Sequence, residues 1–232
     1  IKNRNKNKNI RNFFMHKNVI NLIDIKKEIN LKKPDSVNEV KVIAVSKTFT
    51  MENILPLIDY GHLDYGENKV QEAIDKWSEI KNQNTNLKLH MIGRLQTNKV
   101  KHALKLFDYI HSLDSTRLAK KISEEQNKIE KKIKLFIQIN IGNEKQKSGI
   151  GIDEATDFYN MCIKDLNLNI IGLMCLPPAN LDPAVYFEKM EKISSTLSLK
   201  ELSMGMSSDF LKALKFRTSF VRIGSKIFGK RN

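Results

Sequence analysis

Apolar positions along the chain follow two patterns that alternate. Short β-branched runs typical of buried parallel strands alternate with longer stretches that are apolar on one helical face. Strands are expected at 42–46, 62–65, 87–92, 109–112, 133–141, 168–174, 202–204 and 220–223, and helices at 51–59, 68–80, 98–106, 115–129, 153–165, 183–197 and 208–214. An earlier helical pattern begins at Val19 and is ended by Pro34 and Asp35.

This alternation predicts a parallel sheet with right-handed crossovers. About eight strand–helix units in about 200 residues fit a closed α/β barrel, the (β/α)8 TIM barrel. A doubly wound open sheet is the alternative, but it usually has fewer and longer units, and no G-x-G-x-x-G follows the first strand. We therefore predict one barrel domain over 17–232, with an N-terminal helix, after a basic low-complexity arm over 1–16.

The net positive charge of the chain does not by itself indicate a nucleic-acid-binding protein. The 232 residues carry a formal net charge of +14, and the pI is about 9.6. The lysines are spread along the whole chain together with Asn and Ile, which indicates a compositional bias, so we expect no specific nucleic-acid binding. A basic RNA-associated protein stays open as an alternative, and it would bind nucleic acid with steep salt dependence.

Cellular location is predicted from the cysteines and the arm. Cys162 and Cys175 form no C-x-x-C pair and lie in apolar surroundings, as expected of reduced thiols in the cytoplasm. The arm has no acid before Asp24, so a mitochondrial or other organellar transit peptide is the alternative to a solvated extension. No apolar run approaches the roughly 18 residues of a membrane span, so no membrane association is expected.

Lys47 is the first candidate for chemistry, because it follows an apolar strand directly. Side chains alternate along a strand, so Lys47 is expected to share a face with Ile43 and Val45. Burial there lowers the pKa of an amine, and a neutral amine can form a Schiff base with an aldehyde. The alternative is that Lys47 only marks the return of the strand to water.

A second candidate lies at the ends of the last two strands, which share a rim with Lys47 in such a barrel. Ser207 follows the seventh strand, and Gly224 and Ser225 follow the eighth. Glycines and hydroxyls near helix starts are typical of phosphate sites. An amine facing a phosphate site suggests a phosphorylated aldehyde, of which pyridoxal 5'-phosphate (PLP) is the obvious one.

Seven motifs then make a resemblance specific. The chain resembles the pyridoxal phosphate homeostasis protein family, which shares the fold of the alanine racemase N-terminal domain. The motifs are Ala44-Val-Ser-Lys-Thr48, Gly66-Glu-Asn-Lys-Val-Gln-Glu72, His90-Met-Ile-Gly-Arg-Leu-Gln-Thr-Asn-Lys99, Gln138-Ile-Asn-Ile-Gly142 with Lys147-Ser-Gly149, Gly172-Leu-Met174, Leu202-Ser-Met-Gly-Met-Ser-Ser-Asp209 and Val221-Arg-Ile-Gly-Ser-Lys-Ile-Phe-Gly229.

The resemblance implies a cofactor site. Lys47 would hold PLP as a Schiff base, Asn68 would contact the pyridine hydroxyl and Arg222 the ring nitrogen. The phosphate would be held by Ser207, Gly224 and Ser225. Three positions depart from the family pattern, namely Leu89 in place of Trp, Thr50 in place of Pro and Ser225 in place of a common Thr.

A non-catalytic role is expected from Arg222. An arginine keeps its proton, so the pyridine nitrogen beside it stays unprotonated and the ring is a poor electron sink. Racemases with this arrangement add a second acid or base from a C-terminal β domain, which we do not expect here. Tyr65 and His90 are the nearest substitutes but are more simply wall residues, so we predict no catalytic residue and no metal site.

The resemblance implies a role in intracellular PLP (vitamin B6) and amino-acid homeostasis, and we expect a monomer or weak dimer that holds PLP and passes it to apo-enzymes. A PLP-dependent amino-acid racemase or similar weak enzyme is the alternative.

Overall fold

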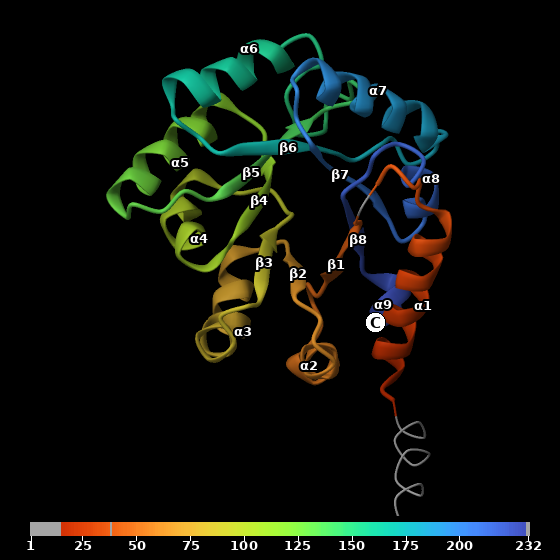
Figure 1. Ribbon diagram of the computed structural model, residues 1–232. Coiled ribbons are helices and arrows are strands. Elements are labelled where there is room, and N and C mark those ends of the chain that lie inside the picture. The colour runs from red at the N-terminus through yellow and green to blue at the C-terminus, as the bar shows by residue number, and fades with distance from the viewer. Residues whose placement is uncertain (1–14, 38, 231–232) are drawn as a thin grey trace, which may run out of the picture.

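The computed structural model describes residues 15–37 and 39–230, and it confirms the (β/α)8 barrel. Eight parallel strands close in sequence order, with β1 pairing with both β2 and β8 (Figure 1). The strands are β1 Lys41–Val45, β2 Asp64–Glu67, β3 Lys88–Met91, β4 Tyr109–Leu113, β5 Lys134–Ile139, β6 Ile170–Cys175, β7 Glu201–Met206 and β8 Phe220–Ile223. The predicted arm falls almost wholly on 1–14, outside the described residues.

Helices connect successive strands and cover the outside of the barrel (Figure 1). They are α1 Lys17–Lys32, α2 Met51–Asp59, α3 Val70–Gln83, α4 Val100–Leu106, α5 Thr116–Lys128, α6 Ala155–Asn160, α7 Pro183–Thr196, α8 Phe210–Ala213 and α9 Ser225–Phe228. None of these helices of the described part is long and apolar enough to cross a membrane. Ser115 caps α5, because its hydroxyl accepts from the Leu118 N–H.

The barrel interior is packed with side chains. Ile43, Tyr109, Phe136, Met174 and Phe220 form one buried cluster, contributed by β1, β4, β5, β6 and β8. Such filling is the rule for eight-stranded barrels, in which the interior is a core and not a pore. A ligand site in this protein therefore lies at the rim and not in the centre of the barrel.

The N-terminal helix α1 covers the side on which the barrel closes, beside α9 (Figure 1). Its apolar face buries Leu22, Ile25 and Ile29. The Asn21 side chain donates to the Ile227 carbonyl of α9 over 2.9 Å, and the Asn18 side chain donates to the Asn53 carbonyl of α2 over 2.9 Å. The helix α1 is therefore hydrogen-bonded to both α2, which follows β1, and α9, which follows β8.

Candidate functional site

The six predicted site residues all lie at the carboxyl ends of strands, on one rim of the barrel. Lys47 comes two residues after β1, Asn68 directly after β2, and Ser207 directly after β7. Arg222 is the third residue of β8, and Gly224 and Ser225 follow that strand. Because the barrel closes with β1 beside β8, the lysine turn and the β8 residues belong to neighbouring strands.

The turn that carries Lys47 has a strained backbone. Lys47 itself is half-buried, and the next residue, Thr48, has φ 68°. A β-branched residue rarely adopts this left-handed conformation, so the surroundings must hold it there. The Glu72 carboxylate of α3 does so by accepting from the Thr48 N–H over 2.6 Å.

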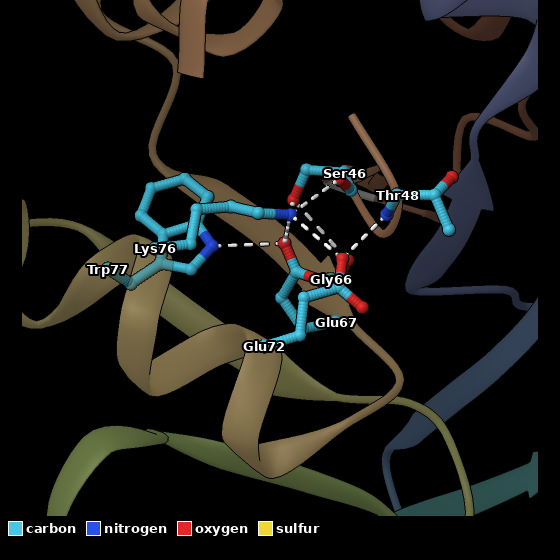
Figure 2. Close-up of polar contacts among 7 residues, drawn as sticks. All are labelled: Ser46, Thr48, Gly66, Glu67, Glu72, Lys76 and Trp77. Carbon is cyan, nitrogen blue, oxygen red and sulfur yellow. Dashed lines mark hydrogen bonds and ion pairs between the residues drawn. The ribbon is translucent and has the colours of Figure 1, made fainter. Parts of the chain in front are cut away.

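Behind this turn lies an ion-pair cluster formed by Glu67, Glu72 and Lys76 (Figure 2). The Lys76 ammonium donates to the Ser46 carbonyl over 3.0 Å, to Glu67 Oε1 over 3.0 Å and to Glu72 Oε1 over 3.1 Å. Glu67 Oε1 also accepts from the Ser46 hydroxyl, over 2.8 Å, and from the Trp77 indole, over 3.0 Å. The backbone on either side of Lys47 is thus tied to α3.

The same cluster affects the acidity of Glu72. Burial acts to raise its pKa, but the Thr48 N–H and the Lys76 ammonium outweigh burial and lower it. Glu72 is therefore ionised at neutral pH and accepts both hydrogen bonds. The motif of residues 66–72 contains both acids, Glu67 at the end of β2 and Glu72 in α3, but only the structure shows that both contact Lys76.

Asn68 is positioned by a close approach of two rim loops. A Cβ added to Gly93 would lie 2.4 Å from the Asn68 carbonyl oxygen and 2.7 Å from its Cα. The Ile92 N–H also donates to the Glu67 carbonyl over 3.0 Å. Gly93 is therefore required for the loop after β3 to lie against Asn68, and this contact fixes the half-buried Asn68.

The predicted phosphate site at Ser207, Gly224 and Ser225, which we call the anion corner, has its backbone donors directly after β8 and in α9. Ser207 Oγ accepts from the Gly224 N–H over 3.2 Å and from the Lys226 N–H over 3.5 Å. A Cβ at Gly224 would lie 3.5 Å from the Val45 Cβ, an ordinary van der Waals contact, so this side of the corner packs against β1. The two N–H groups converge on the Ser207 oxygen, and backbone donors arranged in this way also suit a phosphate oxygen.

The helix expected from residue 208 begins later, at Phe210. The Met206 N–H at the end of β7 donates to Asp209 Oδ1 over 2.6 Å, so this donor is satisfied within the loop. The β7 side of the corner therefore contributes the Ser207 hydroxyl, and the backbone donors come from the β8 side.

Arg222 is buried in the wall of the barrel. Its NH1 donates to the Ser203 carbonyl and hydroxyl, over 2.7 Å each, and its NH2 donates to the Cys175 carbonyl over 2.9 Å. Burial lowers the pKa of Arg222, partly offset by Cys175 and Asp209, but a guanidinium starts so high that it stays charged. The interior thus holds a fixed cation one residue before the end of β8.

Tyr65 and His90, the substitutes considered for a second acid or base, both lie away from the rim. The Tyr65 hydroxyl donates to the His62 carbonyl over 3.1 Å, and burial raises its pKa. His90 is fully buried in the barrel interior, where it contacts His111 and Asp64. Both are therefore core residues, in agreement with the simpler interpretation.

A cavity of about 640 Å³ opens on the rim between the loops after β2, β3 and β4. Among the described residues, Asn68 is the one predicted site residue that lines it. Four cations and one carboxylate also line it, namely Lys69, Arg94, Lys99, Arg117 and Asp114. No local sequence pattern indicates this cavity, since its residues come from three separate loops.

Comparisons with known proteins agree with this fold. Residues 20–232 match the alanine racemase N-terminal domain family. The pyridoxal phosphate homeostasis protein of Pasteurella multocida is 35% identical over 87% of this chain and 90% of its own, and that of Aquifex aeolicus is 36% identical over 84% and 88%.

The chain belongs to the pyridoxal phosphate homeostasis protein family. Its fold is also similar to that of PipY of Synechococcus elongatus PCC7942, solved with PLP bound, with a TM-score of 0.79, 30% identity, and coverage of 91% of this chain and 100% of PipY. An alanine racemase of Clostridium difficile 630 has a TM-score of 0.71 at 15% identity, and the match covers 93% of this chain and 57% of the racemase. That second likeness is one of fold alone.

Proposed function

We propose that this family member binds PLP reversibly, without catalysing a reaction on it, and so limits free PLP in intracellular vitamin B6 and amino-acid homeostasis. The proposal rests on the observation that Lys47 and the anion corner at Ser207 lie on the same rim of the barrel. An amine and a phosphate site on the same rim suit the two reactive ends of PLP. Relatives named for PLP, at 30–36% identity, support the same ligand.

Lys47 forms the covalent link in this proposal. Its amine adds to the aldehyde carbon of PLP, a carbon–nitrogen double bond forms and water leaves, so a Schiff base holds the ligand reversibly. The Glu72–Lys76–Glu67 cluster holds the lysine turn in place, which lowers the entropy lost on binding.

Arg222 and Asn68 orient the ring. A charged guanidinium donates to the pyridine nitrogen without protonating it, and Asn68 contacts the ring hydroxyl. Ser207, Gly224 and Ser225 hold the phosphate. Bound PLP supplies an electron sink to many enzymes, but an unprotonated ring is a weak one, which favours storage over turnover.

The remaining parts of the proposal concern the cell. Apo-forms of PLP-dependent enzymes are the recipients, the protein acts in the cytoplasm, and it is a monomer or weak dimer. Buried, reduced Cys162 and Cys175 suit this compartment, since burial raises the pKa of each thiol to about 12 and keeps both inert.

An absorption spectrum and a racemisation assay test the proposal together. We expect the purified protein, dialysed and then given PLP, to gain visible absorbance at one equivalent. Incubation with L-alanine and other L-amino acids should give no more D-isomer than free PLP does. Absence of the visible band would refute PLP binding, and sustained D-isomer formation that depends on Lys47 would instead favour the racemase.

A further inference from the structure

A line of polar side chains crosses the barrel interior and ends at Arg222. It starts at Asp64, the first residue of β2, at the amino end of the barrel. Asp64 Oδ1 lies 3.0 Å from His90 Nε2, and His90 Nδ1 lies 2.9 Å from His111 Nε2. His111 Nδ1 lies 2.9 Å from Ser203 Oγ, which accepts from Arg222 NH1 over 2.7 Å. We call Asp64, His90, His111 and Ser203 the interior chain.

The two ends of the interior chain fix its direction. An ionised carboxylate only accepts hydrogen bonds, and a guanidinium only donates them. Asp64 therefore requires a proton on His90 Nε2, which leaves His90 Nδ1 as an acceptor for His111 Nε2–H. His111 Nδ1 in turn accepts from the Ser203 hydroxyl. Each of the four bonds then has one donor and one acceptor.

The charge states suit this direction. Burial acts to raise the pKa of Asp64, but the His90 hydrogen bond and nearby positive charges outweigh it and lower the pKa. Burial lowers the pKa of His90, although Asp64 acts to raise it. Burial, together with the positive charge of Arg222, holds the pKa of His111 well below its usual value. At neutral pH the interior chain therefore contains one carboxylate and two neutral imidazoles.

Aromatic packing holds both imidazoles in place. His90 stacks on Tyr109 with ring centroids 4.3 Å apart and an interplanar angle of 8°, and His111 stacks on Phe136 at 4.2 Å and 15°. Both histidines are fully buried. Stacking restricts ring rotation, so the direction of the hydrogen bonds depends on which ring nitrogen carries the proton and not on a rotation of the ring.

The direction matters for Arg222 because Ser203 Oγ is shared. In the direction described, the Ser203 hydroxyl donates its hydrogen bond to His111 Nδ1, and its lone pairs accept from the Arg222 guanidinium. In the reversed direction, His111 Nδ1–H would donate to the same oxygen and compete with Arg222. The serine hydrogen would then also need another acceptor inside the barrel.

We propose that Asp64 is a positioning residue for the PLP site, acting through His90, His111 and Ser203 to hold the Arg222 guanidinium toward the ring. The proposal rests on the proposed function, since the ring is that of PLP. Its physical content is that a carboxylate at the amino end of the barrel orders a hydrogen-bond chain that ends on the opposite rim.

The apo-protein tests the direction without any cofactor. In protein labelled with ¹⁵N-histidine and assigned by single His→Gln variants, we expect His90 and His111 to carry their protons on Nε2. Asp64→Asn should change the tautomer of His111, because an amide can donate as well as accept. A His111 spectrum that does not change in Asp64→Asn would overturn the proposal, since the carboxylate would then not order the chain.

PLP binding tests the consequence. We expect Asp64→Asn to raise the Kd for PLP at least threefold and to shift the absorbance of bound PLP. Asp108→Asn is the matched control, because it removes a half-buried carboxylate at the same end, where Asp108 accepts from Lys81 and from the Leu89 N–H. The control should leave both readouts unchanged.

Ser203→Ala covers the case in which Asp64→Asn does not fold. It removes the shared hydroxyl but keeps the Ser203 carbonyl that binds Arg222, and we expect about a tenfold higher Kd for PLP. An unchanged Kd and spectrum in the variant that folds would refute the positioning role. If the wild type itself fails to bind PLP, the proposed function fails, and the tautomers still report whether the interior chain is ordered.

Discussion

Lys76 is the most informative side chain to remove, because it neutralises a carboxylate that has no access to water. The Glu67 side chain is 0% exposed and that of Lys76 is 10% exposed. Lys76→Met keeps the length and apolar stem of the side chain but leaves Glu67 without its cation and the Ser46 carbonyl without this donor. Breaking one side of a buried ion pair costs about 3–5 kcal/mol.

We therefore expect the free energy of unfolding of Lys76→Met to fall by about 3–5 kcal/mol, a large part of the stability of a typical domain. Urea unfolding followed by tryptophan fluorescence measures it directly. Trp77 is the one tryptophan of the chain, and its indole donates to Glu67 Oε1, so the probe is in the cluster itself.

Two further variants separate this mechanism from general damage. Lys27→Met removes one side of an exposed pair with Asp24, whose side chains are 69% and 62% exposed, and should cost less than about 1 kcal/mol. The double variant Lys76→Met/Glu67→Gln should be more stable than Lys76→Met alone, because no buried charge is left uncompensated. A loss below about 1 kcal/mol in Lys76→Met, or a double variant less stable than the single one, would refute the reasoning.

Three other predictions test the rim and the buried histidines. Ser207→Ala should weaken PLP binding by about 1–3 kcal/mol in equilibrium dialysis, and an unchanged Kd would move the phosphate site elsewhere. Gly93→Ala should cost about 1–3 kcal/mol in urea unfolding and raise the Kd for PLP, because its Cβ would meet Asn68 backbone atoms at 2.4 and 2.7 Å; wild-type stability and affinity would contradict this. Burial and the Lys26 charge lower the pKa of His62 from 6.5 to about 4. Neutral His62 therefore makes its full contribution to the free energy of unfolding above pH 6.5, and about 3 kcal/mol of that free energy is lost as the pH falls from 6.5 to 4. His62→Gln should lose this part of the pH dependence, and equal slopes for both proteins would contradict the assignment.

The sequence pattern predicted most of the elements because strands and helices differ so clearly in period. The predicted helix at 51–59 and strand at 220–223 have the observed bounds. The second strand was misplaced, since it was predicted at 62–65 and β2 is Asp64–Glu67. Gly66 and Glu67 have low strand propensity, and pairing with β1 and β3 overrides that local preference.

The apolar pattern also did not predict the interruption of one helix or the presence of a short one. The single helix predicted at 153–165 is α-helical over Ala155–Asn160 and then widens into a π-helical turn, Met161–Asp165. Periodicity barely distinguishes the two kinds of turn. The helix α9, Ser225–Phe228, was missed because four residues are too short to show a period.

The site residues could be placed on one rim from the sequence, but their supports could not. His111 and Ser203 are 92 positions apart and meet only because the barrel closes. The Glu67–Lys76 pair likewise depends on which side chains of β2 face outward. Both arrangements follow from strand register, which no local pattern specifies.

Borohydride reduction of the PLP-loaded protein, followed by peptide mass spectrometry, identifies the lysine that holds PLP. We expect the pyridoxyl label on Lys47, and we expect it to be lost in Lys47→Ala, which should stay folded because the Lys47 side chain is only half-buried. A label on another lysine, or a label that persists in Lys47→Ala, would contradict this expectation.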